Sequence, residues 1–119
     1  MTPFGAKLRE LRNSRSLTQK QMAAALNVSA AYLSALEHGH RAAPSFDFVQ
    51  RVIGYFNVIW DEAEELQRLA SMSNPKVSID TSGLLPQATE LANLLAQRIG
   101  TMTKEELEAA LESVKLPRP

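Results

Sequence analysis

The pattern of hydrophobic and polar positions predicts helices along most of this chain. Within the first 71 residues, apolar side chains recur every three or four positions in five separate segments. These are Phe4, Leu8 and Leu11; Met22, Ala23 and Leu26; Leu33 and Leu36; Phe46, Val49, Ile53 and Phe56; and Trp60, Ala63, Leu66 and Leu69 or Ala70. Because an α-helix makes one turn in 3.6 residues, each set lies on one face of a helix. We therefore expect a bundle of five helices with these side chains turned inward.

The segment 17–39 predicts two short helices joined by a tight turn. Thr18 is expected to cap the first helix, with Gln21 completing a capping box. Asn27 tolerates the left-handed backbone of a turn, Ser29 can cap the next helix and Gly39 can end it. A pair of helices joined in this way forms a helix-turn-helix, whose second helix enters the major groove of DNA. The segment therefore predicts DNA binding.

A wider set of positions carries a family resemblance. They are Phe4, Gly5, Leu8, Leu11, Arg12, Leu17, Thr18, Gln19, Ala23, Val28, Ser29, Tyr32, Leu33, Ser34, Leu36, Glu37, Gly39, Arg41, Pro44 and Ser45. With them, residues 4–70 resemble the Cro/CI-type (XRE) family of bacterial and phage repressors, although Asn27 stands where the family usually has glycine. The resemblance implies an all-α fold, a lambda-repressor-like five-helix DNA-binding domain, followed here by a C-terminal two-helix extension.

The resemblance also implies which residues touch DNA. The positions that face base edges in the family are Ser29, Ala30, Ala31, Ser34 and Ala35. Phosphate contacts are expected from Thr18, Gln19, Lys20, Ser34, His38, His40 and Arg41. Since alanine offers only a methyl group to a base, direct readout should be thin, and specificity should depend on DNA shape, on Tyr32 or on the basic loop. Tyr32 either reads a base or packs against the turn with its hydroxyl near a phosphate.

Arg12 and Glu37 are expected to form an ion pair. In the family, an arginine at the first position pairs with a glutamate at the second and ties the first helix to the end of the recognition helix. We expect this structural pair in preference to a direct contact between Arg12 and DNA.

Composition limits the class of protein and its location. The chain has 119 residues, no cysteine, no apolar run of membrane-spanning length and no signal-peptide pattern at its start. We therefore expect a cytoplasmic, bacterial or phage protein associated with the nucleoid. The net charge is zero, but residues 1–57 hold seven Lys/Arg against three Asp/Glu (+4) and residues 58–119 hold six against ten (−4). A basic half suits phosphate contacts, although an imbalance of this size also arises by chance.

The remainder of the chain predicts a linker and two further helices. The expected organisation is a DNA-binding domain over 1–72, a linker over 73–86 with a short extended piece at 76–80, and a helical extension over 87–119. Pro86 should open one helix and Gly100 end it, and Thr103 with Glu106 should cap the last helix. The residues 116–119 should be frayed. The apolar stripes of these helices are Ala88, Leu91, Leu95 and Ile99, then Leu107, Leu111 and Val114.

These stripes need a partner, because two helices alone cannot bury them. Either residues 84–116 form a homodimer contact, or they cover the back of the first and fifth helices. The leading function is a repressor that binds a palindromic operator as a dimer; the alternative is an antitoxin or adaptor whose C-terminal helices bind a protein.

Catalysis has little support in the sequence. The acidic run 61–65 is explained by the favourable position of carboxylates in the first turn of a helix, and no acid/base partner accompanies it. His38 and His40 lack the further ligands of a metal site. We therefore expect no enzyme, no metal and no cofactor.

Overall fold

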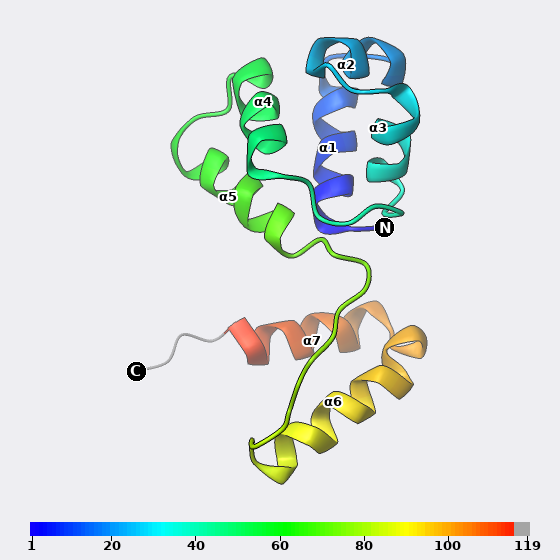
Figure 1. Ribbon diagram of the computed structural model, residues 1–119, viewed down its shortest axis with the longest axis vertical. Coiled ribbons are helices and arrows are strands. Elements are labelled where there is room, and N and C mark those ends of the chain that lie inside the picture. The colour runs from blue at the N-terminus through cyan, green and yellow to red at the C-terminus, as the bar shows by residue number, and fades with distance from the viewer. Residues whose placement is uncertain (116–119) are drawn as a thin grey trace. The chain divides into compact units, whose positions relative to one another are not determined.

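The computed structural model describes residues 1–115, which form two compact units, Met1–Val77 and a second that begins at Ser78 (Figure 1). The first unit contains α1 (Pro3–Ser14), α2 (Gln19–Leu26), α3 (Ala30–Glu37), α4 (Phe46–Phe56) and α5 (Trp60–Ser71). The second contains α6 (Pro86–Arg98), the short 3-10 helix η1 (Ile99–Thr101) and α7 (Lys104–Lys115). The all-α fold, with five helices followed by two, is confirmed. The predicted fraying of 116–119, and with it the end of the predicted extension, lies outside the described residues.

Side-chain caps define where the helices of the first unit begin. The hydroxyl oxygens of Thr2, Thr18, Ser29 and Ser45 each accept a hydrogen bond from the backbone N–H three residues later. The side-chain oxygen of Gln21 in turn accepts a hydrogen bond from the Thr18 N–H at 2.9 Å, so the predicted capping box is present. Because these donors have no partner inside the helix, each cap stabilises its helix by about 1 kcal/mol.

The turn between α2 and α3 needs a left-handed residue, and Asn27 supplies it with φ 58°. Gly39 follows α3 with φ 77°, and a Cβ there would lie 2.8 Å from the Cα of Met1. Both predicted turn positions are therefore confirmed, and Gly39 is needed for conformation as well as for space.

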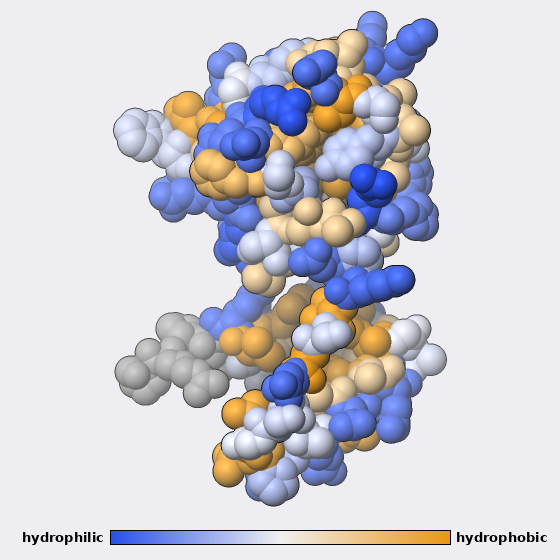
Figure 2. Space-filling model, in the orientation of Figure 1, coloured by the Kyte–Doolittle hydropathy of each residue, from blue (hydrophilic) through white to orange (hydrophobic). Residues whose placement is uncertain are grey.

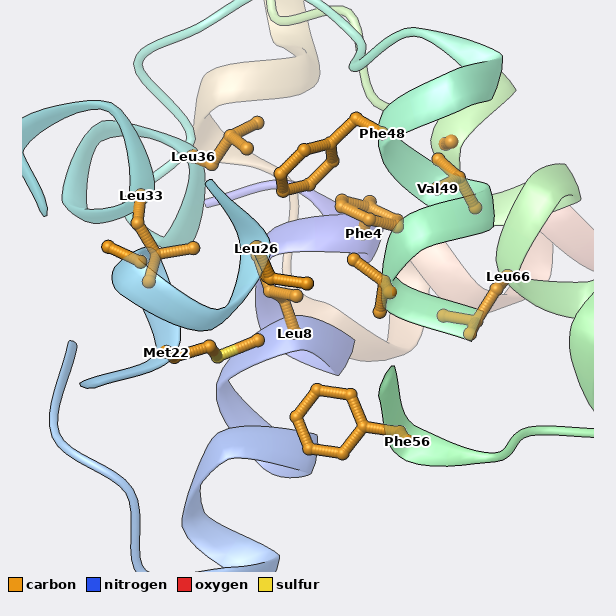
Figure 3. Close-up of a cluster of buried hydrophobic side chains, with 13 residues drawn as sticks. Phe4, Leu8, Met22, Leu26, Leu33, Leu36, Phe48, Val49, Phe56 and Leu66 are labelled. Carbon is orange, nitrogen blue, oxygen red and sulfur yellow. The ribbon is translucent and has the colours of Figure 1, made fainter. Parts of the chain in front are cut away.

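All five helices of the first unit contribute to one core (Figure 3). Its buried members are Phe4, Leu8, Met22, Ala23, Leu26, Leu33, Leu36, Phe48, Val49, Val52, Phe56, Leu66 and Ala70. The ring of Phe48 meets Phe4 and Tyr32 edge-on, with centroids 6.4 and 5.7 Å away. This core fixes α2 and α3 against α1 and α4, and so sets the orientation of the helix-turn-helix.

Two predicted core residues are exposed instead. Phe46, the first residue of α4, is 64% exposed, because the buried face of that helix runs through Phe48 and Val52. Trp60, the first residue of α5, is 82% exposed, because the buried residues of that helix are Leu66 and Ala70. The inward face of α5 begins only at Leu66.

The second unit buries none of its described residues. Pro86 opens α6, and Thr103 with Glu106 forms the predicted capping box of α7. Gly100 does not end α6 directly, since it lies within η1. The segment 76–80, where a short extended piece is predicted, is part of neither a helix nor a paired strand. Apolar side chains on its surface include Leu84, Leu85, Leu91, Leu94, Ile99, Leu111 and Val114 (Figure 2).

Candidate nucleic-acid interface

The residues predicted to bind DNA lie on α2, on α3 and in the loop that follows α3. Eight of them are exposed: Thr18, Lys20, Ser29, Ala30, Ala31, His38, His40 and Arg41. The other four, Gln19, Tyr32, Ser34 and Ala35, are half-buried. None is buried, so every predicted position presents some surface.

The first turn of α3 presents mainly methyl groups. Ala30 and Ala31 are exposed and form no side-chain hydrogen bond, while the Ser29 hydroxyl oxygen accepts the Tyr32 N–H at 3.0 Å. The Ser29 hydroxyl proton remains available to a base. This face therefore offers one hydroxyl donor beside two methyl groups, which suits contact with thymine methyls more than bidentate hydrogen bonding.

Tyr32 links the core to the basic loop. Its ring packs edge-on against Phe48 at an interplanar angle of 85°, and the Arg41 guanidinium carbon lies 5.1 Å from the ring centroid. A guanidinium over an aromatic face is attracted by the ring quadrupole. Tyr32 therefore packs against Phe48 of α4, and the end of the Arg41 side chain lies over its ring.

The two histidines lie close together at the end of α3. Their rings are 6.4 Å apart and nearly parallel, and Nδ1 of His38 lies 2.7 Å from the Ser34 carbonyl oxygen. Within residues 1–115, no group of three His, Cys, Asp or Glu side chains is placed to hold a metal ion.

The acidic run lies on α5, inside the first unit. Its Glu65 carboxylate pairs with Arg68 at 2.6 Å, and this hydrogen bond raises the pKa of the Arg68 guanidinium. Asp61 and Glu62 occupy the first turn, where the helix dipole favours negative charge. These placements account for the run without a catalytic role.

Arg12, Gln19 and Glu37 meet where three helices converge. The fully buried Glu37 carboxylate accepts two bonds from Arg12, at 2.8 and 3.0 Å, and a third from Gln19 at 3.2 Å. Arg12 also donates to the Leu17 carbonyl at 3.0 Å. The Gln19 side chain, predicted to contact phosphate, is thus engaged inside the domain, and Arg12 is paired rather than directed at solvent.

Two further arginines cap helices, a role that the sequence analysis missed. Arg15 donates to the carbonyls of Tyr55 and Phe56 at the end of α4, and Arg51 donates to the Leu26 carbonyl at the end of α2. The guanidinium groups of these arginines also lie over aromatic rings. The basic excess of residues 1–57 therefore includes structural charges, whose partners lie 25 to 41 positions away in the sequence.

Lys20 and Arg41 are the basic residues of the predicted interface. Lys20 forms no ion pair within the described part of the chain. The backbone N–H groups of Gln19 and Lys20, at the start of α2, form no hydrogen bond within residues 1–115. Amides of this kind at a helix N-terminus, beside a lysine, have the chemistry needed to bind an anion such as a phosphate group.

Parts of this chain are similar to known proteins. Residues 8–62 match the family model described as helix-turn-helix. The uncharacterized HTH-type transcriptional regulator RghRB of Bacillus subtilis (strain 168) is 36% identical over 61 residues, which are 51% of this chain and 44% of that protein. The chain thus aligns with less than half of that relative. A solved structure of the SinR protein/SinI protein complex aligns with 94% of both chains at 18% identity, with a TM-score of 0.47.

The five-helix unit, with its capped α2 and exposed α3, is thus a DNA-binding helix-turn-helix domain. The match to the helix-turn-helix family model over residues 8–62 agrees with the resemblance to the Cro/CI-type, or XRE, family. Within residues 1–115, no helix has the length and apolar character needed to cross a membrane.

Proposed function

We propose that this chain is a sequence-specific transcriptional regulator, a repressor that binds a palindromic operator in double-stranded DNA as a homodimer. The observation that carries the proposal is the contrast between the two sides of α3. Glu37 and Leu33 are buried and fix the helix, while Ala30 and Ala31 are exposed. A rigidly held helix with an unoccupied outer face suits insertion into the major groove.

The contacts follow from this orientation. Base edges meet the start of α3, and phosphates meet the start of α2 and the loop after α3. The proposed base contacts are Ser29, Ala30, Ala31, Ser34 and Ala35; the proposed phosphate contacts are Thr18, Gln19, Lys20, His38, His40 and Arg41. The proposed phosphate contact of Gln19 is made by its backbone N–H, because its side chain is hydrogen-bonded to Glu37. Tyr32 supports Arg41 rather than reading a base.

The second unit supports the dimer. Leu91 and Leu94 on α6 and Leu111 and Val114 on α7 are exposed, and the unit has no buried residue among those described. Burying such side chains against a second copy gains about 25 cal/mol per Å² of apolar area. Two domains held in this way would read half-sites about 34 to 36 Å apart.

The same exposed side chains favour one second candidate, an antitoxin or adaptor whose α6 and α7 bind another protein. The purified chain distinguishes the two, because a homodimer forms without any other component. A chain that stays monomeric at high concentration favours the second candidate.

Selection and salt titration test the proposal. The protein is used to select from random duplex DNA, and affinity for the enriched duplex is measured as salt is raised. Lys20 and Arg41 of two protomers neutralise about four phosphates, which predicts a slope of log K against log salt near −4, together with an enriched palindrome. A flat salt response with no enriched sequence would refute the proposed function.

A further inference from the structure

Asn74, which follows α5, is hydrogen-bonded to the loop that joins α3 and α4. Its Oδ1 accepts the backbone N–H of Ala43 at 2.8 Å, across 31 positions of sequence. Both residues belong to the first unit. Ala43 lies two positions after Arg41, so this bond holds the loop that carries a proposed phosphate contact.

The neighbouring residue fixes the position of Asn74. Ser73 is 3% exposed, its hydroxyl oxygen accepts the Phe4 N–H at 2.9 Å, and its hydroxyl donates to the Leu69 carbonyl. These bonds join the end of α5 to the start of α1, so the backbone that presents Asn74 is tied to two helices of the core. The amide oxygen of Asn74 is thus a fixed point for the loop.

The loop has few other restraints. In the described structure, residues 41–44 form no other main-chain hydrogen bond, and the next ones lie at His40, bound to Ala35, and at Ser45, which caps α4. Loop segments with few bonds sample many conformations, and ordering them on binding costs affinity. The bond to Asn74 supplies that order before DNA arrives.

The surface around this bond connects Asn74 to the cationic side chains of the loop. Asn74 and Lys76 line one shallow hollow together with His40. His40 and Arg41 line the next hollow with Tyr32. The residues after α5 therefore border the predicted phosphate-binding loop directly.

We propose that Asn74 is a positioning residue of the DNA interface, which holds the α3–α4 loop in the conformation that presents Arg41 to a phosphate. This inference rests on the proposed function, because it takes Arg41 to be a phosphate contact. Asn74 itself acts through the Ala43 N–H and does not touch DNA.

A double-mutant cycle in the full chain tests the inference. Affinity for a random-sequence duplex is measured for Asn74→Ala, for Arg41→Ala and for the double variant, with Asn13→Ala as a matched control outside the interface. Asn74→Ala should weaken binding about three- to tenfold, the range for one lost hydrogen bond. It should add less than about twofold in the Arg41→Ala background, because the two residues act through one contact.

A second measurement reports on the loop without DNA. Hydrogen exchange of the Ala43 amide should become faster in Asn74→Ala, whereas Asn74→Asp, which retains the acceptor oxygen, should keep it slow. The slope of log K against log salt should also become less negative, by about 1 per protomer, in both Asn74→Ala and Arg41→Ala.

The outcomes separate the inference from the proposed function. If Arg41→Ala weakens binding while Asn74→Ala equals the wild type, or if their effects simply add, the positioning role is wrong and the DNA contact stands. If Arg41→Ala has no effect, the phosphate contact is wrong and the positioning role falls with it. Unchanged exchange of the Ala43 amide in Asn74→Ala also overturns the role.

Discussion

Arg12 on α1 holds both carboxylate oxygens of Glu37 at the end of α3. Its Nε lies 2.8 Å from Oε2 and its Nη2 lies 3.0 Å from Oε1, while the Glu37 side chain is completely buried. Since Gln19 of α2 donates to the same carboxylate, one buried charge fixes the relative positions of three helices. The recognition helix therefore owes its orientation to this pair as well as to the apolar core.

Removing the arginine should destabilise the first unit strongly. Arg12→Met leaves a buried carboxylate without its main partner, which lowers the free energy of unfolding by about 3 to 5 kcal/mol. Arg12→Lys should retain only part of this free energy of unfolding, because an ammonium group does not form the two parallel hydrogen bonds. Urea denaturation followed by circular dichroism measures both.

The exposed pair Lys7–Glu10, at 3.2 Å, provides the control. Lys7→Met should cost less than about 1 kcal/mol. Equal losses for Lys7→Met and Arg12→Met would contradict the structural role of the buried pair.

The turn before α3 should accept glycine and reject alanine. Asn27 has φ 58°, a conformation that costs alanine about 1 to 2 kcal/mol and costs glycine little. Thermal denaturation should therefore show a lower Tm for Asn27→Ala and a nearly unchanged Tm for Asn27→Gly. Asn13→Ala, at ordinary φ in α1, is the control, and an Asn27→Ala variant as stable as this control would speak against the strained turn.

The start of α7 should respond to acid. The Thr103 N–H, which donates to the Glu106 carboxylate at 2.9 Å, holds the pKa of that carboxyl below its ordinary value, and Arg98 adds a smaller attraction. Because the pKa of Glu106 is lower in the folded than in the unfolded state, its contribution to stability is complete above the unfolded pKa. It is lost as pH falls through the lower folded pKa.

NMR titration of the Glu106 carboxyl measures this directly. The midpoint should fall below the ordinary glutamate value, and helix signals of α7 should weaken over the same pH interval. Glu106→Gln, which cannot titrate, should remove that pH dependence. A midpoint at or above the ordinary value would mean that the capping box does not form.

The apolar surface of the second unit should control assembly. Leu91→Glu combined with Leu111→Glu places two carboxylates among exposed apolar side chains, and should convert a dimer into a monomer in sedimentation equilibrium. Gln97→Glu, an exposed polar position of α6, should leave the dimer intact. A doubly substituted chain that still dimerises would show that other residues make the contact.

The helix-turn-helix was predictable because its signals are local. Thr18, Asn27 and Ser29 each specify a cap or a turn from their own chemistry and the few residues around them. The Arg12–Glu37 expectation came from the family resemblance, since 25 positions separate the two residues.

The missed features depend on tertiary contacts. Periodicity alone placed Phe46 in the core, whereas packing against Phe4 and Tyr32 selects Phe48. A polar stretch after α5 predicts a linker, yet Ser73 and Asn74 bond to segments 69 and 31 positions away. No local pattern in the sequence indicates such pairings.

The central claim is that the outer face of α3 meets DNA, and Ala31→Glu tests it most directly. Ala31 is exposed and has no side-chain bond, so the substitution should leave the fold intact while placing a carboxylate against the base edges of the proposed DNA interface. Ala6→Glu, at an exposed position of α1, adds the same charge outside α2, α3 and the loop that follows α3. We expect Ala31→Glu to weaken binding to the selected duplex about a hundredfold or more, with Ala6→Glu nearly unchanged. Equal affinities for the two variants would contradict the account.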